Sequence, residues 1–526
     1  MDDELELRPS AVGTHVVYRQ RLLYSSRPQA GARARVRGLS ILPGTLILWQ
    51  SPLLWYGLDE LERVTPDDCW IVGVEADETL YRLSLGQLPE PHQHRLSLIN
   101  TSAEDVASVL SELESARYRR VVELTTNGGA MLNRPVYRRT RDLLDRQIQV
   151  VWQNRLTIHA MGRLWVRNSI MNLPSLLGAE GPMLDDRPVV VCGAGPSLDT
   201  AAPMIAEQRQ HIQIIAVDTA VPALAARSIV PDLVIAVEAQ LINAYDFLPV
   251  GRREYLLLAD LGSTPAAVDL HARRGWLVSM HSRITLLDRL AKLPGVWAAL
   301  PPLGSVGVSA VLVAMRMSHG PIYLTGLDFA VVPGQTHARD TPAARRQHIS
   351  NMRLHPVGDP TLNISRVQTR SAAGNACATT LVLAGYAKEL ARTIGNRRVH
   401  HIAPIGPPVG AQPIDVATAG ILIRQQTGNG EGKSGARGQG GPIIPDANDH
   451  QAGLSRFARN EKSLLERVIA GEENEELVSA CDYLAAIGGI ADQSATSARN
   501  QSVRILATYF RERWAIATDL INLRHS

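Results

Sequence analysis

An alternation of short apolar runs with helical segments, between about residues 187 and 412, constrains the fold more than any other feature. The apolar runs have the composition of strands that are buried on both faces of a parallel sheet. They are Val189–Cys192, Ile212–Val217, Leu233–Val237, Tyr255–Ala259, Trp276–Met280 and Ile322–Leu324. The helical segments between them are Asp199–Glu207, Ala220–Arg227, Pro265–Arg273, Thr285–Lys292 and Val308–Met317. This order predicts an α/β fold with an open, mostly parallel sheet, helices on both of its faces, and a ligand at the carboxyl ends of the strands.

The rest of the chain divides by pattern and composition. Near the N-terminus, the apolar runs Thr45–Trp49 and Trp70–Val74 flank a helical stretch at Gly57–Val64, which indicates a small β-α-β unit. Ordering the glycine-rich segment Thr427–Gly441 would cost much chain entropy, and the segment has no large apolar residues whose burial could offset that cost. Beyond it, apolar residues recur with helical spacing, which either a small helical bundle or a partner-binding tail would produce. We predict an N-terminal α/β domain at 1–115, a helical connector at 116–186, the core at 187–412, a flexible linker at 413–449 and a C-terminal helical region at 450–526.

Composition narrows the classes of function. The formal net charge is only +3, from 54 Lys and Arg against 51 Asp and Glu, which argues against a protein that coats nucleic acid. The 4 cysteines are too few and too far apart for a disulfide framework or a metal knuckle, so a reducing cytoplasm is the expected compartment. Residues 1–8 are acidic and polar, unlike a signal peptide, and no apolar run of about 20 residues occurs. We expect a cytoplasmic protein with no membrane span and no nucleic-acid partner.

The sharpest local signal is a glycine turn between a strand and a helix, in the segment Val189–Asp199. Gly193 and Gly195 allow a ligand to approach the backbone, and Ser197 can cap a helix whose first amides attract phosphate. The segment is not a full dinucleotide fingerprint, because Leu198 stands where the third glycine would be. A nucleotide-phosphate site and an ordinary strand-to-helix turn both fit this segment.

Further polar residues stand at neighbouring strand ends. Asp218 closes the next strand, where an acidic residue commonly meets a ribose hydroxyl, although it can equally cap the following helix. Glu238 ends the strand after that, and the alternative for it is a solvated loop position. Ser305 lies in a second glycine turn before a helix, where it can present a hydroxyl to the ligand or simply cap the helix. Because the carboxyl ends of parallel strands share one edge, these residues are predicted to converge on one crevice.

Two residues are candidates for acid–base chemistry. Asp328 follows a strand, and His337 comes within ten residues of it, so the two can supply a carboxylate and an imidazole near one reacting bond. An ordinary surface histidine is the alternative for His337. The chain contains no P-loop, H-E-x-x-H or G-x-S-x-G motif, and it offers no set of metal ligands, so no metal-binding residue is predicted.

Together these segments resemble the MptE-like family, which includes the motility accessory factors (Maf proteins) and an archaeal 6-hydroxymethylpterin pyrophosphokinase. The segments that carry the similarity are Gly193–Asp199, Ile214–Asp218, Pro231–Glu238, Thr325–Ala330 and Gln335–Ala338. Upstream, Asn154–Thr157, Gly162–Trp165 and Asn168–Leu173 are similar to the helical segment before the Maf core. Ser51–Leu58 with Val74–Asp77 is more weakly similar to the Rossmann-like N-terminal half of Maf proteins.

For Maf proteins the resemblance implies a sialyltransferase-like core and a glycosyltransferase activity. Such an enzyme moves a nonulosonic, sialic-acid-like sugar from a CMP-sugar donor to Ser or Thr of flagellin, and it requires no cofactor. By position, the resemblance assigns Gly193, Gly195 and Ser197 to the donor phosphate. It assigns Asp218 and Glu238 to hydroxyls of the nucleotide or sugar. Asp328 and His337 would then act at the reacting end.

Two alternatives remain open. A 6-hydroxymethylpterin pyrophosphokinase would share the core but need ATP and Mg²⁺, which Asp218, Glu238 and Asp328 could coordinate. A non-catalytic, motility-associated scaffold would keep the fold and use the C-terminal helices to recruit a partner. Glu238 stands where many members of the family have Asp, which implies a different sugar or acceptor, or a loss of activity.

Overall fold

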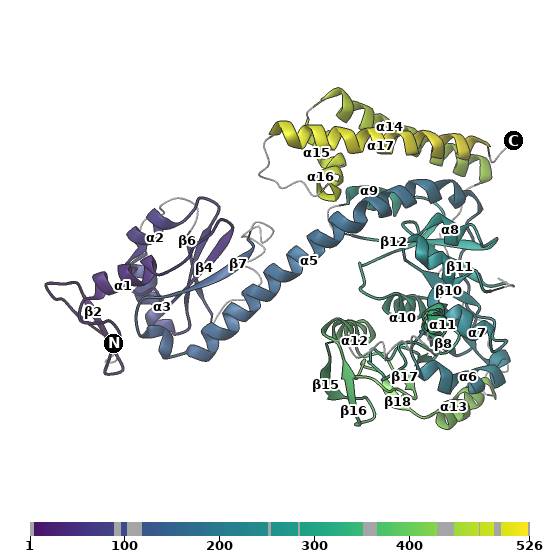
Figure 1. Cartoon of the computed structure of the whole chain (residues 1–526), viewed down its shortest axis with the longest axis horizontal. Coiled ribbons are helices and arrows are strands. Elements are labelled where there is room, and N and C mark those ends of the chain that lie inside the picture. Colours follow the sequence, from purple (N-terminus) through teal and green to yellow (C-terminus); the bar gives the residue numbers. More distant parts are fainter. Residues whose placement is uncertain are drawn as a thin grey trace. The chain divides into compact units, whose positions relative to one another are not determined.

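The computed structural model describes residues 5–88, 96–101, 118–250, 254–281, 284–350, 365–428, 446–472, 474–488 and 496–523. The chain divides into two compact units, Met1–Thr157 and Ile158–Ser526, and helix α5 (Arg134–Asn172) contributes residues to both (Figure 1). Both units contain a parallel sheet with helices, as the sequence predicts. No helix in these described ranges is long and apolar enough to cross a membrane.

The first unit is built on a parallel sheet with the order β6-β5-β4-β7. Its strands are β4 (Thr45–Gln50), β5 (Trp70–Glu75), β6 (Leu96–Asn100) and β7 (Arg120–Thr125). Its helices are α1 (Pro28–Arg37), α2 (Leu58–Val64) and α3 (Glu78–Gly86). An antiparallel sheet of β1 (Leu5–Arg8), β2 (His15–Tyr18) and β3 (Arg21–Leu22) precedes them.

Strand β4 reads as continuously apolar because both of its faces are buried. Leu46 and Leu48 pack into one apolar cluster, which includes Leu144 and Ile148 of α5. Ile47 and Trp49 pack into a second cluster with residues of α1 and α2. Successive side chains of a strand point to opposite faces, so one strand serves both clusters. This confirms the predicted β-α-β unit and explains the run of apolar residues that indicated it.

Two predicted boundaries are wrong in part. The connector expected at 116–186 begins with a strand, since β7 pairs with β4, and only α5 and the 3-10 turn η3 (Leu173–Gly178) follow the helical expectation. The linker expected at 413–449 contains helix α13 (Val416–Gly428). Residues 429–445, which hold most of the glycine-rich segment, lie outside the described residues. The predicted flexibility of that segment stays a prediction.

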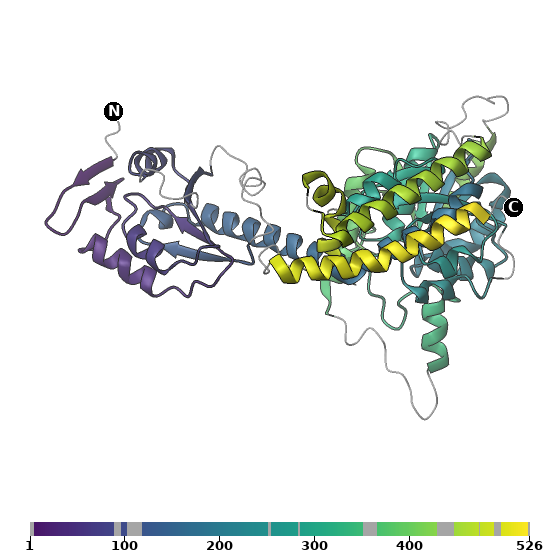
Figure 2. The same cartoon turned by 90° about the horizontal axis from the view of Figure 1, so that it is seen from above.

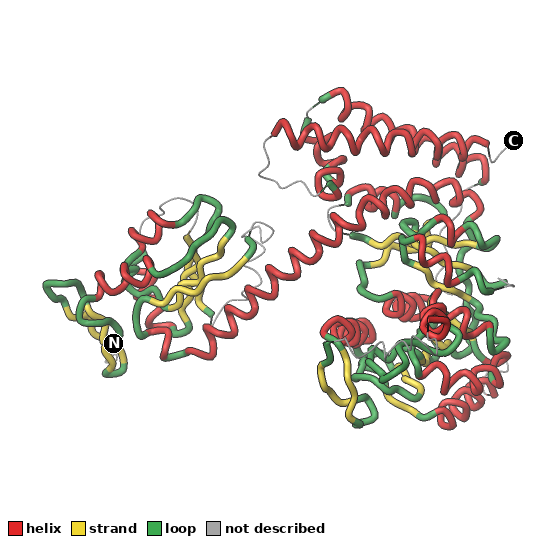
Figure 3. The backbone as a smooth tube through the Cα atoms, viewed as in Figure 1, coloured by secondary structure: helices red, strands yellow, loops and turns green. Residues whose placement is uncertain are grey.

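In the described part of the second unit, nine strands form one parallel sheet with the order β13-β12-β11-β10-β9-β8-β14-β17-β18 (Figure 3). From β8 the chain adds strands in one direction as far as β13, and then returns to place β14 on the other side of β8. The strands are β8 (Val189–Cys192), β9 (Gln213–Val217), β10 (Leu233–Ala236), β11 (Leu256–Asp260), β12 (Arg274–Ser279), β13 (Val296–Leu300), β14 (Ile322–Thr325), β17 (Val399–Ile402) and β18 (Gln412–Ile414). The strand order therefore reverses between β8 and β14, and such a switch point is where open α/β sheets bind their ligands.

Helices and turns connect these strands. All five predicted helices are present: α6 (Ser197–Glu207), α7 (Val221–Ala225), α8 (Pro265–Val268), α9 (Thr285–Leu290) and α10 (Val306–Met317). Three more follow at α11 (Pro342–Ser350), α12 (Leu381–Ile394) and α13. Two short 3-10 turns stand after strands, η5 (Asp218–Ala220) and η6 (Leu241–Asp246). An antiparallel pair, β15 (Val367–Arg370) and β16 (Ala376–Thr379), was not predicted.

The C-terminal region is helical, as predicted, and it packs on the same unit as the nine-stranded sheet. Its helices are α14 (Ala447–Ala470), α15 (Glu475–Cys481), α16 (Tyr483–Ile487) and α17 (Thr496–Leu523), of which α14 and α17 lie side by side (Figure 2). The guanidinium of Arg289 on α9 binds both carboxylate oxygens of Glu461, at 2.5 and 2.8 Å. Leu465, Phe510 and Trp514 join the apolar cluster that contains the core strands. A small helical bundle is thus the form that this region takes.

A buried carboxyl lies at the end of β5 in the first unit. Glu75 is fully buried and accepts hydrogen bonds from Ser84 Oγ at 2.7 Å, Ser51 Oγ at 3.1 Å and the Tyr137 hydroxyl at 3.2 Å. Burial raises the pKa of Glu75 to about 7, although the hydrogen bonds oppose that change. The folded unit therefore holds a proton on Glu75 at pH values where the unfolded chain has released it.

We predict that the free energy of unfolding falls as pH rises from about 4.5 to about 7, because the folded state binds the Glu75 proton more tightly. The slope from this one group is at most about 1.4 kcal/mol per pH unit. Glu75→Gln should remove this part of the pH dependence, as measured by urea unfolding of the full chain at pH 5.5, 7 and 8.5. Glu123→Gln, an exposed carboxyl on the same sheet, should keep the wild-type dependence. Equal pH profiles for Glu75→Gln and the wild type would contradict the assignment.

Candidate functional site

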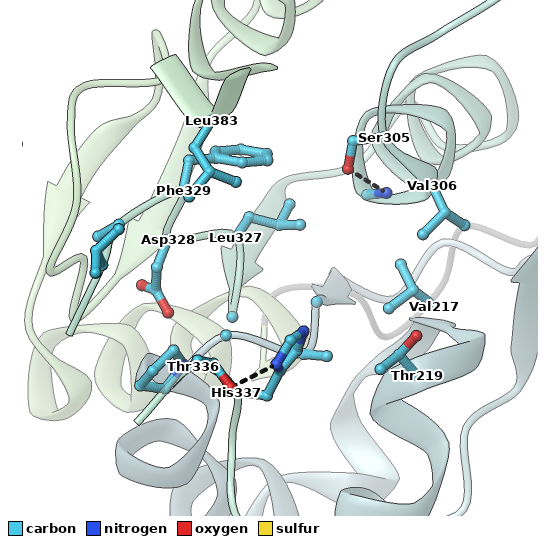
Figure 4. Close-up of a pocket in the computed structure, with 18 of the residues that line it drawn as sticks. Val217, Thr219, Ser305, Val306, Leu327, Asp328, Phe329, Thr336, His337 and Leu383 are labelled. Carbon is cyan, nitrogen blue, oxygen red and sulfur yellow. Dashed lines mark hydrogen bonds between the residues drawn. The ribbon is translucent and has the colours of Figure 1, made fainter. Parts of the chain in front are cut away.

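A pocket of about 410 Å³ opens at the carboxyl ends of β8, β9 and β14, at the switch point of the sheet (Figure 4). It contains five of the predicted site residues: Gly193, Gly195, Ser305, Asp328 and His337. Apolar side chains form much of the remaining wall, among them Val217, Val306, Leu327, Phe329 and Leu383. The sequence predicts a ligand at this edge of the sheet, and the structure brings residues from six separate segments together there.

The two glycines of the turn line the pocket, but their amides bind within the protein. Gly193 N donates to Thr325 O, and Gly195 N donates to Gly326 O, both at 2.8 Å. A Cβ on Gly193 would lie 2.3 Å from Gly326 O, and a Cβ on Gly195 would lie 2.4 Å from Asp328 Oδ2. The glycines are therefore required for the close approach of the β8 and β14 turns. The predicted phosphate contact does not come from these two amides.

Ser197 and Asp328 form one buried unit at the start of α6. Ser197 N donates to Asp328 Oδ2 at 2.9 Å, and Ser197 Oγ accepts from Gly326 N at 2.9 Å. Ser197 is buried and is not among the residues that line the pocket in the described chain. The anion that the helix N-terminus attracts is thus the Asp328 carboxylate itself. Within the described residues Asp328 Oδ1 has no hydrogen-bond partner, and burial raises the pKa of this carboxyl.

His337 lies in a loop that is hydrogen-bonded to the glycine turn. Ala338 N donates to Ala194 O at 2.8 Å, and Asp199 on α6 accepts from Arg339 N at 3.1 Å. The His337 ring lies 3.1 Å, through Nδ1, from Thr336 Oγ1 (Figure 4). Burial, and then the nearby Arg346 guanidinium, lower the pKa of His337, so the ring is neutral at pH 7. A neutral imidazole in a pocket is suited to accept a proton.

Ser305 has both of the roles considered for it, as a helix cap and as a residue of the pocket. Its Oγ accepts from Gly307 N at 3.2 Å and so caps α10, and the residue also lines the pocket. Val306 and Gly307, in the first turn of α10, line the pocket as well. The N-terminus of a twelve-residue helix carries partial positive charge and attracts anions. The first turn of α10 therefore faces the pocket, whereas α6 contributes its N-cap residue, Pro196, to the lining.

Asp218 and Glu238 do not line the pocket in the described chain. Asp218 is buried between two residues that do, Val217 and Thr219, and its Oδ1 accepts from Thr219 N at 2.8 Å. Burial, and then the nearby Asp246 carboxylate, raise the pKa of Asp218 to about 7. Burial also raises the pKa of Glu238, and that of Asp246 to about 6. The three carboxyl groups form an acidic cluster behind Thr219.

No group of three or more His, Cys, Asp or Glu side chains is placed to hold a metal ion in the part of the chain that the structure describes. The structure does not bring Asp218, Glu238 and Asp328 together as one set of ligands, and their use for Mg²⁺ stays a prediction of the pyrophosphokinase alternative. The physical reason for their separation is that Asp328 is held at the start of α6, whereas the other two follow β9 and β10. Sequence reasoning also missed Thr219, Thr380 and Asp246, since a threonine after a strand or an aspartate in a loop carries no distinctive pattern.

We predict that Gly195→Ala lowers the free energy of unfolding by about 1–3 kcal/mol, because its Cβ would contact Asp328 Oδ2 and Gly326 O. The matched control is Gly385→Ala in α12, where a Cβ meets nothing within 4 Å. That control should be neutral or slightly stabilising, since alanine favours helix over glycine. Urea unfolding of both variants tests the difference, and equal stabilities would show that the turns can separate freely.

Comparisons with known proteins agree with this architecture. Residues 167–334 match the family model described as 6-hydroxymethylpterin diphosphokinase MptE-like. An uncharacterized protein of Treponema pallidum (strain Nichols) is 29% identical over 358 residues, covering 66% of this chain and 62% of that protein. A second uncharacterized protein of the same organism is 32% identical over 94 residues, covering 17% of this chain and 45% of its own length. The chain thus spans less than two thirds of the length of both relatives.

A solved structure extends the comparison over both units. The Maf glycosyltransferase from Magnetospirillum magneticum AMB-1 matches with a TM-score of 0.58 at 15% sequence identity, covering 99% of this chain and 91% of that chain. At this identity the match establishes the fold. Residues 167–334 are thus similar to the MptE-like family, and the fold of the chain is that of a Maf glycosyltransferase.

Proposed function

We propose that the protein is a glycosyltransferase that moves a nonulosonic acid from a CMP-sugar donor to a Ser or Thr hydroxyl of flagellin in the cytoplasm. The observation that carries this proposal is that a neutral imidazole, His337, and a carboxyl group, Asp328, line one pocket at the switch point of the sheet. The fold of the Maf glycosyltransferase supports the reaction class. The donor and the acceptor come from the family resemblance.

In the proposed step the acceptor hydroxyl attacks the anomeric carbon of the sugar. A bond forms between the acceptor oxygen and that carbon, the bond from the carbon to the phosphate oxygen breaks, and CMP leaves with the electron pair. The His337 ring takes the proton of the hydroxyl as the new bond forms. The N-terminus of α10 stabilises the negative charge on the leaving phosphate. Asp328 Oδ1 accepts a hydrogen bond from a hydroxyl of the bound ligand.

His337→Gln is expected to lower the rate of transfer by roughly 10²–10⁴-fold, the usual contribution of a general base. Asp328→Asn should also lower the rate, and its amide oxygen can still accept from Ser197 N. Both variants should still be stabilised by CMP, because the proposed phosphate contacts come from α10. His319→Gln, an exposed histidine in the same unit, is the control and should transfer at the wild-type rate. Full activity of His337→Gln would overturn the assignment of the base.

The pH dependence gives a second test. Because the pKa of His337 lies below its ordinary value of 6.5, the ring stays unprotonated until the solution is more acidic than that. The acidic limb of the profile of transfer rate against pH should therefore lie below pH 6.5. A limb above that pH would assign the proton transfer to a different group.

The family description favours one competing function, a 6-hydroxymethylpterin diphosphokinase. Melting curves of the purified chain with CMP, a CMP-linked nonulosonic acid, or ATP with Mg²⁺ separate the two proposals, since a ligand that binds only the folded form raises the melting temperature. A shift with the CMP compounds supports the transferase. A shift with ATP and Mg²⁺ alone supports the diphosphokinase, and no shift with any of them supports the scaffold.

A further inference from the structure

The rim of the pocket carries exposed apolar side chains on segments that also form its wall. At the start of α12, Thr380 and Leu383 line the pocket, and Thr380 Oγ1 accepts from Leu383 N at 3.1 Å. The two residues between them point away from the wall: Leu381 is 82% exposed and Val382 is 60% exposed. Large apolar side chains cost free energy when they face water, so two adjacent ones at a pocket mouth indicate a surface that is covered during function.

A second apolar group lies beyond another part of the pocket wall. Thr219 lines the pocket, and η6 packs against the turn that carries it, with Asp246 of η6 beside Thr219. Figure 4 shows Thr219 and Leu383 on opposite sides of the pocket. On η6 and just after it, four large apolar side chains are more than half exposed: Leu241, Ile242, Tyr245 and Leu248. We call these four residues, with Leu381 and Val382, the apolar rim.

Charge around the apolar rim restricts what can cover it. Glu238 precedes η6 and Asp246 ends it, and both lie in the acidic cluster with Asp218, with Arg346 as the cation near Asp246. Asp218 and Asp246 are buried, whereas Glu238 is exposed, and its carboxylate would repel an anionic lipid surface. A polypeptide that combines apolar side chains with a basic one complements both features. The proposed reaction also requires an acceptor hydroxyl to enter the pocket, so the chain that carries it must cross this rim.

We propose that the apolar rim is the docking surface for the acceptor polypeptide, and that it selects a segment in which apolar residues and a basic residue flank the acceptor Ser or Thr. This inference rests on the proposed transferase function and adds the basis of acceptor recognition. Leu381 and Val382 contact the segment on one side of the pocket, and Leu241 and Tyr245 contact it on the other. The exposed carboxylate of Glu238 attracts its basic residue.

The test measures transfer from a CMP-linked nonulosonic acid to purified flagellin at varied flagellin concentration. Two double variants remove the apolar contacts, Leu381→Ser with Val382→Ser and Leu241→Ser with Tyr245→Ser. Each should raise the KM for flagellin by roughly tenfold or more, because exposed apolar contacts at an interface act through affinity. Met183→Ser is the control: Met183 is 88% exposed and stands before β8, at the amino edge of the sheet. It should keep the wild-type KM.

Two readouts separate failure of this inference from failure of the proposed function. Stabilisation by CMP and slow hydrolysis of the donor without acceptor report on the pocket alone, and both double variants should retain them. If they do, and the KM for flagellin is also unchanged, the apolar rim is not the docking surface. If the wild-type chain is not stabilised by CMP, the proposed function fails and this inference fails with it.

A photocrosslinking residue at position 381 or 245 gives an independent measurement. Crosslinks to flagellin from these two positions, with none from position 183, support the proposal. A covalent dimer of this chain would identify a second copy as the occupant and overturn it. Cosedimentation with anionic phospholipid vesicles that the double variants abolish would identify a lipid surface and also overturn it. Among Ser-containing acceptor peptides, one with Lys beside the apolar residues should be the better substrate than the same peptide with Glu.

Discussion

The larger unit depends on the contact between two glycine turns at the ends of β8 and β14. A Cβ on Gly326 would lie 2.2 Å from Gly193 O, so the two backbones meet with no side chain between them. This approach lets the amides of the first turn bind the carbonyls of the second and sets Asp328 against the start of α6. The loop that carries His337 is fastened to the same turn through Ala194 O. One junction therefore holds residues that are more than a hundred positions apart in the chain.

The sequence predicted the strands of the core because burial on both faces makes each of them a short apolar run, as in Val189–Cys192. It also predicted that the strand ends converge. It did not show that β14 lies beside β8. The role of Ser197 depends on this pairing, because the Ser197 hydroxyl accepts a hydrogen bond from Gly326 N, which follows β14. β15 and β16 were missed because most of their side chains are exposed or half-buried and show no apolar periodicity. Local sequence patterns indicate which residues are buried. The hydrogen-bond partner of a polar group depends instead on the order of the strands in the sheet.

The sheet of the first unit also has a point where the strand order reverses. There, side chains of the unit itself make the hydrogen bonds. The strand order reverses between β4 and β7, and Asn127 Nδ2 donates there to Ser51 O at 2.7 Å. A Cβ on Gly129 would lie 2.2 Å from Ser51 Oγ, and the Trp55 indole donates to Ser84 O at 2.9 Å. The weak resemblance of this segment to the Rossmann-like N-terminal half of Maf proteins is consistent with this topology. Its polar groups stabilise the loop itself, and the fold alone does not imply a ligand.

Two kinds of titratable group with opposite charge preference lie at the proposed donor site, an imidazole in its wall and carboxyl groups behind that wall. Asp218, with a pKa of about 7, and Asp246, with a pKa of about 6, lie behind Thr219 and gain protons as the solution becomes acidic. An anionic donor beside them favours their protonated forms, so its binding strengthens toward low pH. His337 must instead be unprotonated to accept the hydroxyl proton, which favours higher pH. The lowered pKa of His337 separates these two requirements, because it leaves a range near neutral pH in which the carboxyls are partly protonated while the imidazole remains a base.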